Sequence, residues 1–251
     1  MLEFLPIASY ELVLFSIILF FAYIIKGLSG FGSGLIAIPL LAFFLPLTLI
    51  VPVLGLVSYS GTVIQSISYR KNVAWRDMLP LLPFSLLGIV IALWVFVNVD
   101  VTILTFILGI FIFLYSIYSL IPSEFYKGSR LWAIASGFLA GFVGTLFGTG
   151  GPFYVLYLKI RQLNKSQFRA TISMTFLVDG GARIIGYSYA GFFTREIIML
   201  TVVLLPILFI GLYIGHHLHV KIDEQRFNQV VSILLLVSGI SLAIKSIFIM
   251  V

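Results

Sequence analysis

Two oppositely charged residues stand four positions apart inside an otherwise apolar stretch of the chain. The stretch is TFLVDGGARIIGY, residues 175–187, and it places Asp179 and Arg183 on one face of a helix. A guanidinium can bind a sulfonate or a carboxylate through paired N–H donors, while a nearby carboxylate can hold the guanidinium in place or carry a coupling proton. The alternative is an ion pair that only locks helices together.

Two glycine-rich stretches could supply further ligands for an anion. They are KGLSGFGSGLIAIPLL, residues 26–41, and GTLFGTGGPFYVLYLKIR, residues 144–161. In the first, Ser33 stands between two glycines as a candidate N-cap of a helix. In the second, Thr149 is the candidate N-cap and Pro152 takes an early helical position, where its missing N–H costs nothing. Such helix beginnings expose unpaired amides and the positive end of the helix dipole, which attract anions.

The composition predicts an all-α integral membrane protein. Of the 251 residues, 61% are hydrophobic and 10% are charged, and the mean hydropathy is +1.18. Long apolar segments with short charged gaps favour a helical bundle over a β-barrel. The basic residues behind the net charge of +6 lie beside these segments, so we expect them to set topology and expect no nucleic-acid partner. The N-terminus has no basic region and is not expected to be a cleaved signal.

Ten apolar segments can be drawn along the chain. They cover residues 8–26, 33–45, 48–69, 77–97, 101–121, 130–147, 151–160, 166–190, 195–218 and 226–249. Eight are long enough to cross a hydrocarbon core of ~30 Å, whereas 33–45 and 151–160 are too short and are expected to be broken or half helices. Because lipid cannot hydrogen-bond free backbone groups, we expect both breaks to face the protein interior.

The positions of Lys and Arg predict the orientation of the chain in the membrane. If all ten segments carry the chain across and the N-terminus is outside, most basic residues fall on one side, which the positive-inside rule makes cytoplasmic. These residues are Arg70, Lys71, Arg76, Lys127, Arg130, Lys159, Arg161, Lys165, Arg169, Lys221 and Arg226. If the two short segments are re-entrant, the basic residues divide almost evenly between the faces, so ten passes are preferred. Lys26 and Lys245 are long enough to snorkel.

The two glycine-rich stretches also align with each other. Ser33 falls opposite Thr149, and further along Gly88 falls opposite Gly211. The chain therefore divides into two membrane repeats of about five segments each, which together form one transmembrane transporter domain. They are residues 1–122 and residues 123–251. Since five is odd, the second repeat enters from the opposite face, as in the inverted repeats of many secondary transporters.

This repeat predicts one substrate site built from both halves. Interrupted segments at matching places are the best sequence pointer to a binding site in a transporter. The predicted substrate-binding residues are Ser33, Gly34, Thr149, Gly150, Gly151, Arg183 and its repeat partner Gln65, with Asp179 as a coupling residue or a structural ion-pair partner. The competing interpretation is that the glycines only allow helices to approach closely.

The same motifs resemble those of a known family. The elements GLSGFGSGLIAIPLL and GFVGTLFGTGGPFYVLYL, together with YRKNVAWRD after the third segment, are similar to the sulfite exporter TauE/SafE family over nearly the whole chain. The resemblance implies a bacterial-type inner-membrane transporter of small anions, with sulfite and organosulfonates such as sulfoacetate among the substrates attributed to the family.

Three functions follow as hypotheses. The first is a secondary transporter, expected to export a small anion by alternating access. No ATP-binding motif such as GxxxxGK(S/T) is present, so an ion gradient, the membrane potential or the substrate gradient would drive it and no cofactor is expected. The second is an intramembrane enzyme that uses Asp179 and a histidine, which are predicted to lie too far apart. The third is a membrane scaffold or channel-like subunit in which the glycines only pack.

The expected partners are the small anion and the lipid bilayer, and association into a homo-oligomer remains open. His216, His217 and His219 form a local cluster, but adjacent histidines do not share a helix face. We therefore interpret the cluster as a solvated interface and expect no metal.

Overall fold

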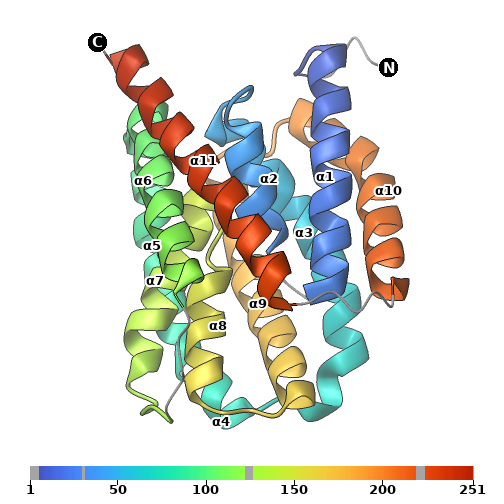
Figure 1. Ribbon diagram of the computed structural model, residues 1–251, viewed down its shortest axis with the longest axis vertical. Helices are drawn as coiled ribbons and strands as arrows, with labels where there is room; N and C mark the ends of the chain where they lie inside the picture. The colour runs from blue at the N-terminus through green and yellow to red at the C-terminus, as the bar shows by residue number, and fades with distance from the viewer. Residues whose placement is uncertain (1–5, 30–31, 122–126, 219–223, 251) are drawn as a thin grey trace.

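The part of the chain that the structure describes is built from helices. A computed structural model describes residues 6–29, 32–121, 127–218 and 224–250. The first half contains α1 (Ser9–Ser29), α2 (Ser33–Leu41), α3 (Leu47–Tyr69), the 3₁₀ turn η2 (Arg70–Asn72), α4 (Trp75–Met78), α5 (Leu81–Asn98) and α6 (Val101–Leu120). The second half contains α7 (Trp132–Phe147), α8 (Gly151–Ile160), α9 (Lys165–Tyr189), α10 (Arg195–His217) and α11 (Glu224–Met250) (Figure 1). The all-α prediction is confirmed for these residues.

Within the described residues, six helical segments are long and apolar enough to cross a membrane. They are Ser9–Leu28, Leu47–Ile67, Trp75–Asn98, Val101–Leu120, Arg195–His217 and Ser232–Ile249. Large apolar side chains cover the outside of these segments. Val90, Trp94, Val202 and Tyr213, for example, are each more than half exposed. An apolar surface of this extent fits contact with lipid rather than with water.

Two of the eight segments expected to be long enough to cross are not among these six. The segment expected at 130–147 forms α7, whose 16 residues rise only ~24 Å, because the chain turns at Gly148. The segment expected at 166–190 forms α9, which is 25 residues long but is not among the six apolar spans. Asp179, Arg183 and several hydroxyl-bearing residues lower its hydropathy.

The two segments expected to be short are short helices. α2 has 9 residues and α8 has 10, so each rises about 14–15 Å, roughly half of a hydrocarbon core. α2 packs against α1, and α8 packs against α7. Figure 1 shows α2 in the half of the molecule that carries both chain termini and α8 in the half that carries α4. The two short helices therefore approach the middle of the bundle from opposite ends.

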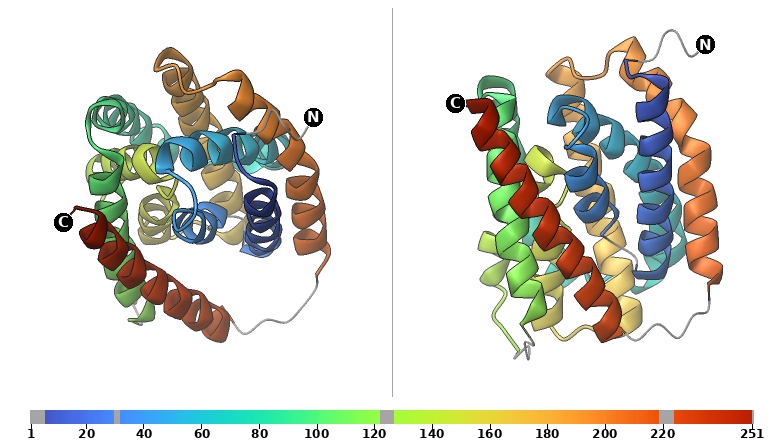
Figure 2. Two further views of the ribbon diagram at one scale, coloured as in Figure 1. Left: turned by 90° about the horizontal axis from the view of Figure 1, so that it is seen from above. Right: turned by 45° about the horizontal axis from the view of Figure 1, so that its top comes forward.

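Helices of the first half pack against helices of the second half. The most extensive contacts join α1 with α10, α5 with α7, α3 with α9, and α6 with α11. Figure 2 shows α1 beside α10 and α6 beside α11. A Cβ added at Gly88 of α5 would lie 2.8 Å from the backbone nitrogen of Phe142 in α7, and one added at Gly211 of α10 would lie 3.0 Å from the carbonyl oxygen of Phe20 in α1. Glycine at these positions lets the paired helices approach closely.

The end of the bundle that carries α4 is held together by an ionic cluster. Asp77 accepts hydrogen bonds from Arg130 Nε at 3.0 Å and from Arg161 Nε at 2.9 Å. Arg161 also donates to the carbonyl oxygen of Gly128 through Nη1. The cluster thus joins α4, the residues that precede α7 and the end of α8. Arg195, by contrast, begins α10 at the end that carries the chain termini (Figure 1).

Candidate functional site

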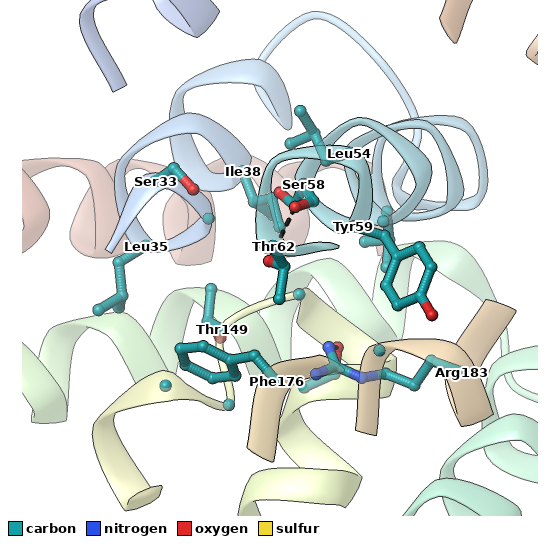
Figure 3. A pocket seen from close by; sticks show the side chains of 18 of the residues that line it. Ser33, Leu35, Ile38, Leu54, Ser58, Tyr59, Thr62, Thr149, Phe176 and Arg183 are labelled. Carbon is teal, nitrogen blue, oxygen red and sulfur yellow. Dashed lines mark hydrogen bonds between the residues drawn. The ribbon is translucent and has the colours of Figure 1, made fainter. Parts of the chain in front are cut away.

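A central cavity brings the two glycine-rich stretches together. Its volume is about 110 Å³, which holds several water molecules and is well below the ~300–1,000 Å³ of pockets for drug-sized ligands. Six of the predicted substrate-binding residues line it, namely Ser33, Gly34, Thr149, Gly150, Gly151 and Arg183. Figure 3 shows Ser33, Thr149 and Arg183 entering this space from different elements. The cavity therefore joins both halves of the chain.

The start of α2 forms one wall of the cavity. Gly32 precedes the helix with a φ of 94°, in the left-handed region, and Ser33 is the first helical residue. The predicted N-cap role of Ser33 is wrong, because Gly32 takes the N-cap position and no described side chain bonds the first amides of α2. The amides of this first turn are consequently left for another partner.

The start of α8 forms the facing wall. Gly148 ends α7 with a φ of 60°, and α8 begins at Gly151 with Pro152 in its first turn, as predicted. The predicted N-cap role of Thr149 is wrong, because Gly150 takes that position. Instead, Thr149 Oγ1 is buried without a hydrogen-bond partner among the described residues. A buried hydroxyl left unpaired costs ~1–3 kcal/mol, so its position in the cavity is explained if a ligand satisfies it.

The two walls touch where the helix breaks meet. A Cβ added at Gly34 would collide with the carbonyl oxygen of Gly148, and a Cβ added at Gly148 would collide with Ile38 Cδ1. At Gly34 the obstacle is backbone, so a side chain there would push the breaks apart. At Gly148 the obstacle is the end of a flexible side chain, and it is the φ of 60° that favours glycine.

The predicted pairing of Asp179 with Arg183 is confirmed. Arg183 Nη2 donates to Asp179 Oδ2, and the Asp179 side chain is 0% exposed. Tyr154 donates its hydroxyl to Asp179 Oδ1 at 2.7 Å, and Arg183 Nη1 donates to the carbonyl oxygen of Gly144 at 2.8 Å. Arg183 Nε is also buried, yet within the described part of the chain nothing accepts its hydrogen. The guanidinium is thus fixed through its outer nitrogens and keeps one unused donor.

Helix α3 contributes a polar face that the sequence reasoning missed. Ser58, Tyr59 and Thr62 line the cavity. Thr62 donates its hydroxyl to the carbonyl oxygen of Ser58 at 2.9 Å, as Figure 3 marks, and the Ser58 hydroxyl pairs with the Tyr23 hydroxyl at 2.6 Å. The predicted Gln65 is not among the lining residues, because it lies nearly one turn further along α3 than Thr62. Serine and threonine at a spacing of four were the available signal.

Lys26 is a further lining residue, and its predicted position was wrong. The expected snorkelling does not occur, because Lys26 is only 5% exposed and lines the central cavity. Its Nζ lies 5.5 Å from the centroid of the Tyr23 ring. Lys245 does reach outward, and its Nζ donates to the carbonyl oxygen of Phe43 at 2.6 Å.

The chemistry of the lining suits an anion and not a metal ion. Hydroxyl groups, uncapped amides and cationic side chains converge on the cavity, and all of these can donate hydrogen bonds to oxyanions. In the part of the chain that the structure describes, no group of three or more His, Asp or Glu side chains could hold a metal. His216 and His217 are exposed at the end of α10, and His219 lies outside the described residues.

Comparison with known proteins identifies the family. The model of the family described as sulfite exporter TauE/SafE matches residues 15–242. The chain belongs to the sulfite exporter TauE/SafE family. As a member of the TauE/SafE family it is a multi-pass membrane transporter and not an enzyme.

A similar protein agrees with this class. The chain is 28% identical over 177 residues to the probable inner membrane transporter protein TsaS of Comamonas testosteroni, a match that covers 68% of this chain and 73% of the relative. No solved structure matches the chain.

Proposed function

We propose that the protein is a secondary transporter that exports a small anion, such as sulfite, sulfoacetate or another organosulfonate, across the inner membrane. The observation that carries the proposal is a pair of buried donors, Thr149 Oγ1 and Arg183 Nε, that lack partners among the described residues and belong to two residues that line one cavity. Sulfite and sulfonate oxygens accept hydrogen bonds from hydroxyl and guanidinium groups, and charge strengthens the second kind. The starts of α2 and α8 add uncapped amides and two positive dipole ends.

The family and its relative support the class of substrate and the membrane. The family is described as a sulfite exporter, and TsaS is named as a probable inner membrane transporter. We propose that this chain shares both properties, the export of a sulfite-like anion and a location in the inner membrane. The small size of the cavity fits an anion with a compact head group.

We infer that residues 1–122 and residues 123–251 are inverted repeats that rock against each other. The helix contacts support this inference because the contacts of α10 with two helices of the other half, α1 and α3, each have a counterpart between the corresponding helices. The contact of α1 with α10 corresponds to that of α7 with α5, and the contact of α3 with α10 corresponds to that of α9 with α5. Gly88 and Gly211, which align in the sequence, sit at corresponding contacts. Rocking of such halves can expose one site to either face in turn.

We further propose that the N-terminus lies outside and that α2 and α8, each about half as long as a hydrocarbon core is thick, enter the membrane without crossing it. Most of the described basic residues lie at the end that carries α4, where Arg130 and Arg161 join Asp77. The positive-inside rule assigns such an end to the cytoplasm. The opposite end, which carries both chain termini in Figure 1, would then face outward.

The alternative function is a scaffold or channel-like subunit in which the glycines only pack. Some glycines do pack, since a Cβ at Gly88 or Gly211 would meet the backbone of a neighbouring helix. Packing alone gives no role to the donors of Thr149 and Arg183 that find no acceptor among the described residues. Anion binding accounts for both donors.

A transport assay with purified protein in liposomes tests the proposal. We expect the wild type to move sulfite or methanesulfonate, and Arg183→Gln to move neither while thermal unfolding in detergent confirms that it folds. The matched control is Arg195→Gln, since Arg195 is exposed at the start of α10 and should transport as the wild type does. If no small anion moves through the wild type, or if Arg183→Gln transports normally, the proposal is wrong.

A further inference from the structure

Lys26 carries a charge that no group of the described structure offsets. The side chain is only 5% exposed and lines the central cavity. Among the described residues, no carboxylate lies within ion-pair distance of its Nζ and no hydrogen bond to it is formed. Asp179 is not available to it, because Tyr154 bonds Oδ1 and Arg183 bonds Oδ2.

The Tyr23 ring holds the ammonium group without neutralising it. Lys26 Nζ lies 5.5 Å from the ring centroid, within the range of a cation–π contact. The ring is itself fixed, because the Tyr23 hydroxyl pairs with the Ser58 hydroxyl at 2.6 Å. The contact positions the charge at the cavity and leaves its N–H donors for a ligand.

The charges around the cavity leave an excess of one positive charge. The described lining contains two cations, Lys26 and Arg183, and no carboxylate. Asp179 pairs directly with Arg183 and offsets that cation. One cation, Lys26, is left over.

We propose that Lys26 is the counter-ion of the transported anion and that it makes the site select a monoanion over a dianion. This proposal rests on the function proposed above and narrows its substrates. A monoanion brings the site to neutrality, whereas a dianion leaves an excess negative charge in a site with little water, which is costly. The substrate class is therefore a small sulfur oxyanion with a single negative charge, such as a simple sulfonate or hydrogensulfite, in preference to sulfate.

Equilibrium binding to the full-length protein in detergent tests this inference with two probes of similar shape, methanesulfonate and sulfate. We expect the wild type to bind methanesulfonate more tightly, and Lys26→Gln to weaken that binding by roughly tenfold or more, as expected when a charged hydrogen bond is lost. Lys26→Arg, which keeps the charge, should bind better than Lys26→Gln. The control Lys71→Gln removes an exposed lysine of η2 and should bind methanesulfonate as the wild type does.

A second variant tests the charge count even if Lys26→Gln fails to fold. Asp179→Asn adds one positive charge to the site, so the ratio of sulfate affinity to methanesulfonate affinity should rise. The inference fails if Lys26→Gln folds and binds methanesulfonate normally, if the wild type prefers sulfate, or if Asp179→Asn leaves the ratio unchanged. Failure of the wild type to bind either anion would instead overturn the proposed function as well.

Discussion

Gly34, in the first turn of α2, lies against the carbonyl oxygen of Gly148, which ends α7, so closely that a Cβ on Gly34 would collide with that oxygen. The contact joins the two broken elements of the chain at their tips. It brings the uncapped start of α2 and the turn before α8 to one cavity. Two segments far apart in the sequence thus form a single site because neither has a side chain at the point of contact.

Replacing Gly34 by alanine should separate these tips. The added methyl group must displace backbone rather than a flexible side chain, so we expect a loss of ~1–3 kcal/mol or more in stability. The matched control is Gly151→Ala, whose Cβ would lie 3.6 Å from Phe176 Cζ, an ordinary contact. Thermal unfolding in detergent measures both variants. Equal unfolding temperatures for the two would contradict the contact.

Replacing Thr149 by valine should weaken anion binding without destabilising the fold. The hydroxyl has no partner among the described residues, so its removal should leave stability unchanged or slightly higher. The loss of one hydrogen bond to a charged ligand, worth ~1.5–3 kcal/mol, should weaken methanesulfonate binding by roughly tenfold or more.

The control for Thr149 is Thr175→Val. The Thr175 hydroxyl donates to the carbonyl oxygen of Thr171 within α9, at 2.8 Å, and does not line the cavity. Calorimetric titration of both variants should therefore show weaker binding only for Thr149→Val. An unchanged affinity in Thr149→Val would remove Thr149 from the site.

Replacing Tyr154 by phenylalanine should destabilise the buried ion pair. The Tyr154 hydroxyl is the donor to Asp179 Oδ1 at 2.7 Å, so its loss leaves a fully buried carboxylate oxygen unpaired, at a cost of ~1–3 kcal/mol or more. The control is Tyr157→Phe, because the Tyr157 hydroxyl is buried without a partner in the described structure. The unfolding temperature should fall for Tyr154→Phe alone. A comparable fall in both variants would argue against the hydrogen bond from Tyr154 to Asp179.

Asp100 lies between two membrane-spanning segments and should make the stability of the protein depend on pH. Its Oδ1 accepts from the backbone N–H of Thr102 at 2.7 Å as the N-cap of α6, and this hydrogen bond lowers the pKa of the carboxyl group. Because the pKa is lower in the folded state, the stabilisation is present above the unfolded pKa of ~3.9 and is lost as the pH falls through the folded pKa.

The measurement for Asp100 compares three proteins from neutral to acidic pH. The unfolding temperature of the wild type should exceed that of Asp100→Ala at pH near ~7, and the gap should close as the carboxylate is protonated. Asp100→Asn keeps a capping side chain that does not titrate. The difference in unfolding temperature between Asp100→Asn and Asp100→Ala should therefore vary less with pH. A wild-type gap that stays constant into acid would be inconsistent with a charged cap.

The sequence predicted the helical class, the two short helices and six of the residues that line the cavity, because each depends on local signals. Glycine clusters mark where helices break, and a charged pair at a spacing of four marks one helix face. The low hydropathy of α9 was not predicted. Neighbouring helices bury Asp179, so α9 can be long without being uniformly apolar.

The capping roles and two of the cavity residues depend on tertiary packing, which the sequence does not contain. Ser33 and Thr149 have the residue types of N-caps, but the left-handed glycines before them shift the helix starts. Lys26 could snorkel in an isolated α1, yet the helix packs with that residue facing the cavity. Gln65 matches Arg183 in the alignment but lies beyond the cavity, and Thr62 takes its place.

The most direct test of the central claim is an experimental structure of the protein determined with an excess of methanesulfonate. The account predicts an anion in the central cavity, with its oxygens within hydrogen-bond distance of Thr149 Oγ1 and Arg183 Nε. An anion bound only elsewhere, or a cavity filled by neighbouring apolar side chains at saturating methanesulfonate, would contradict it.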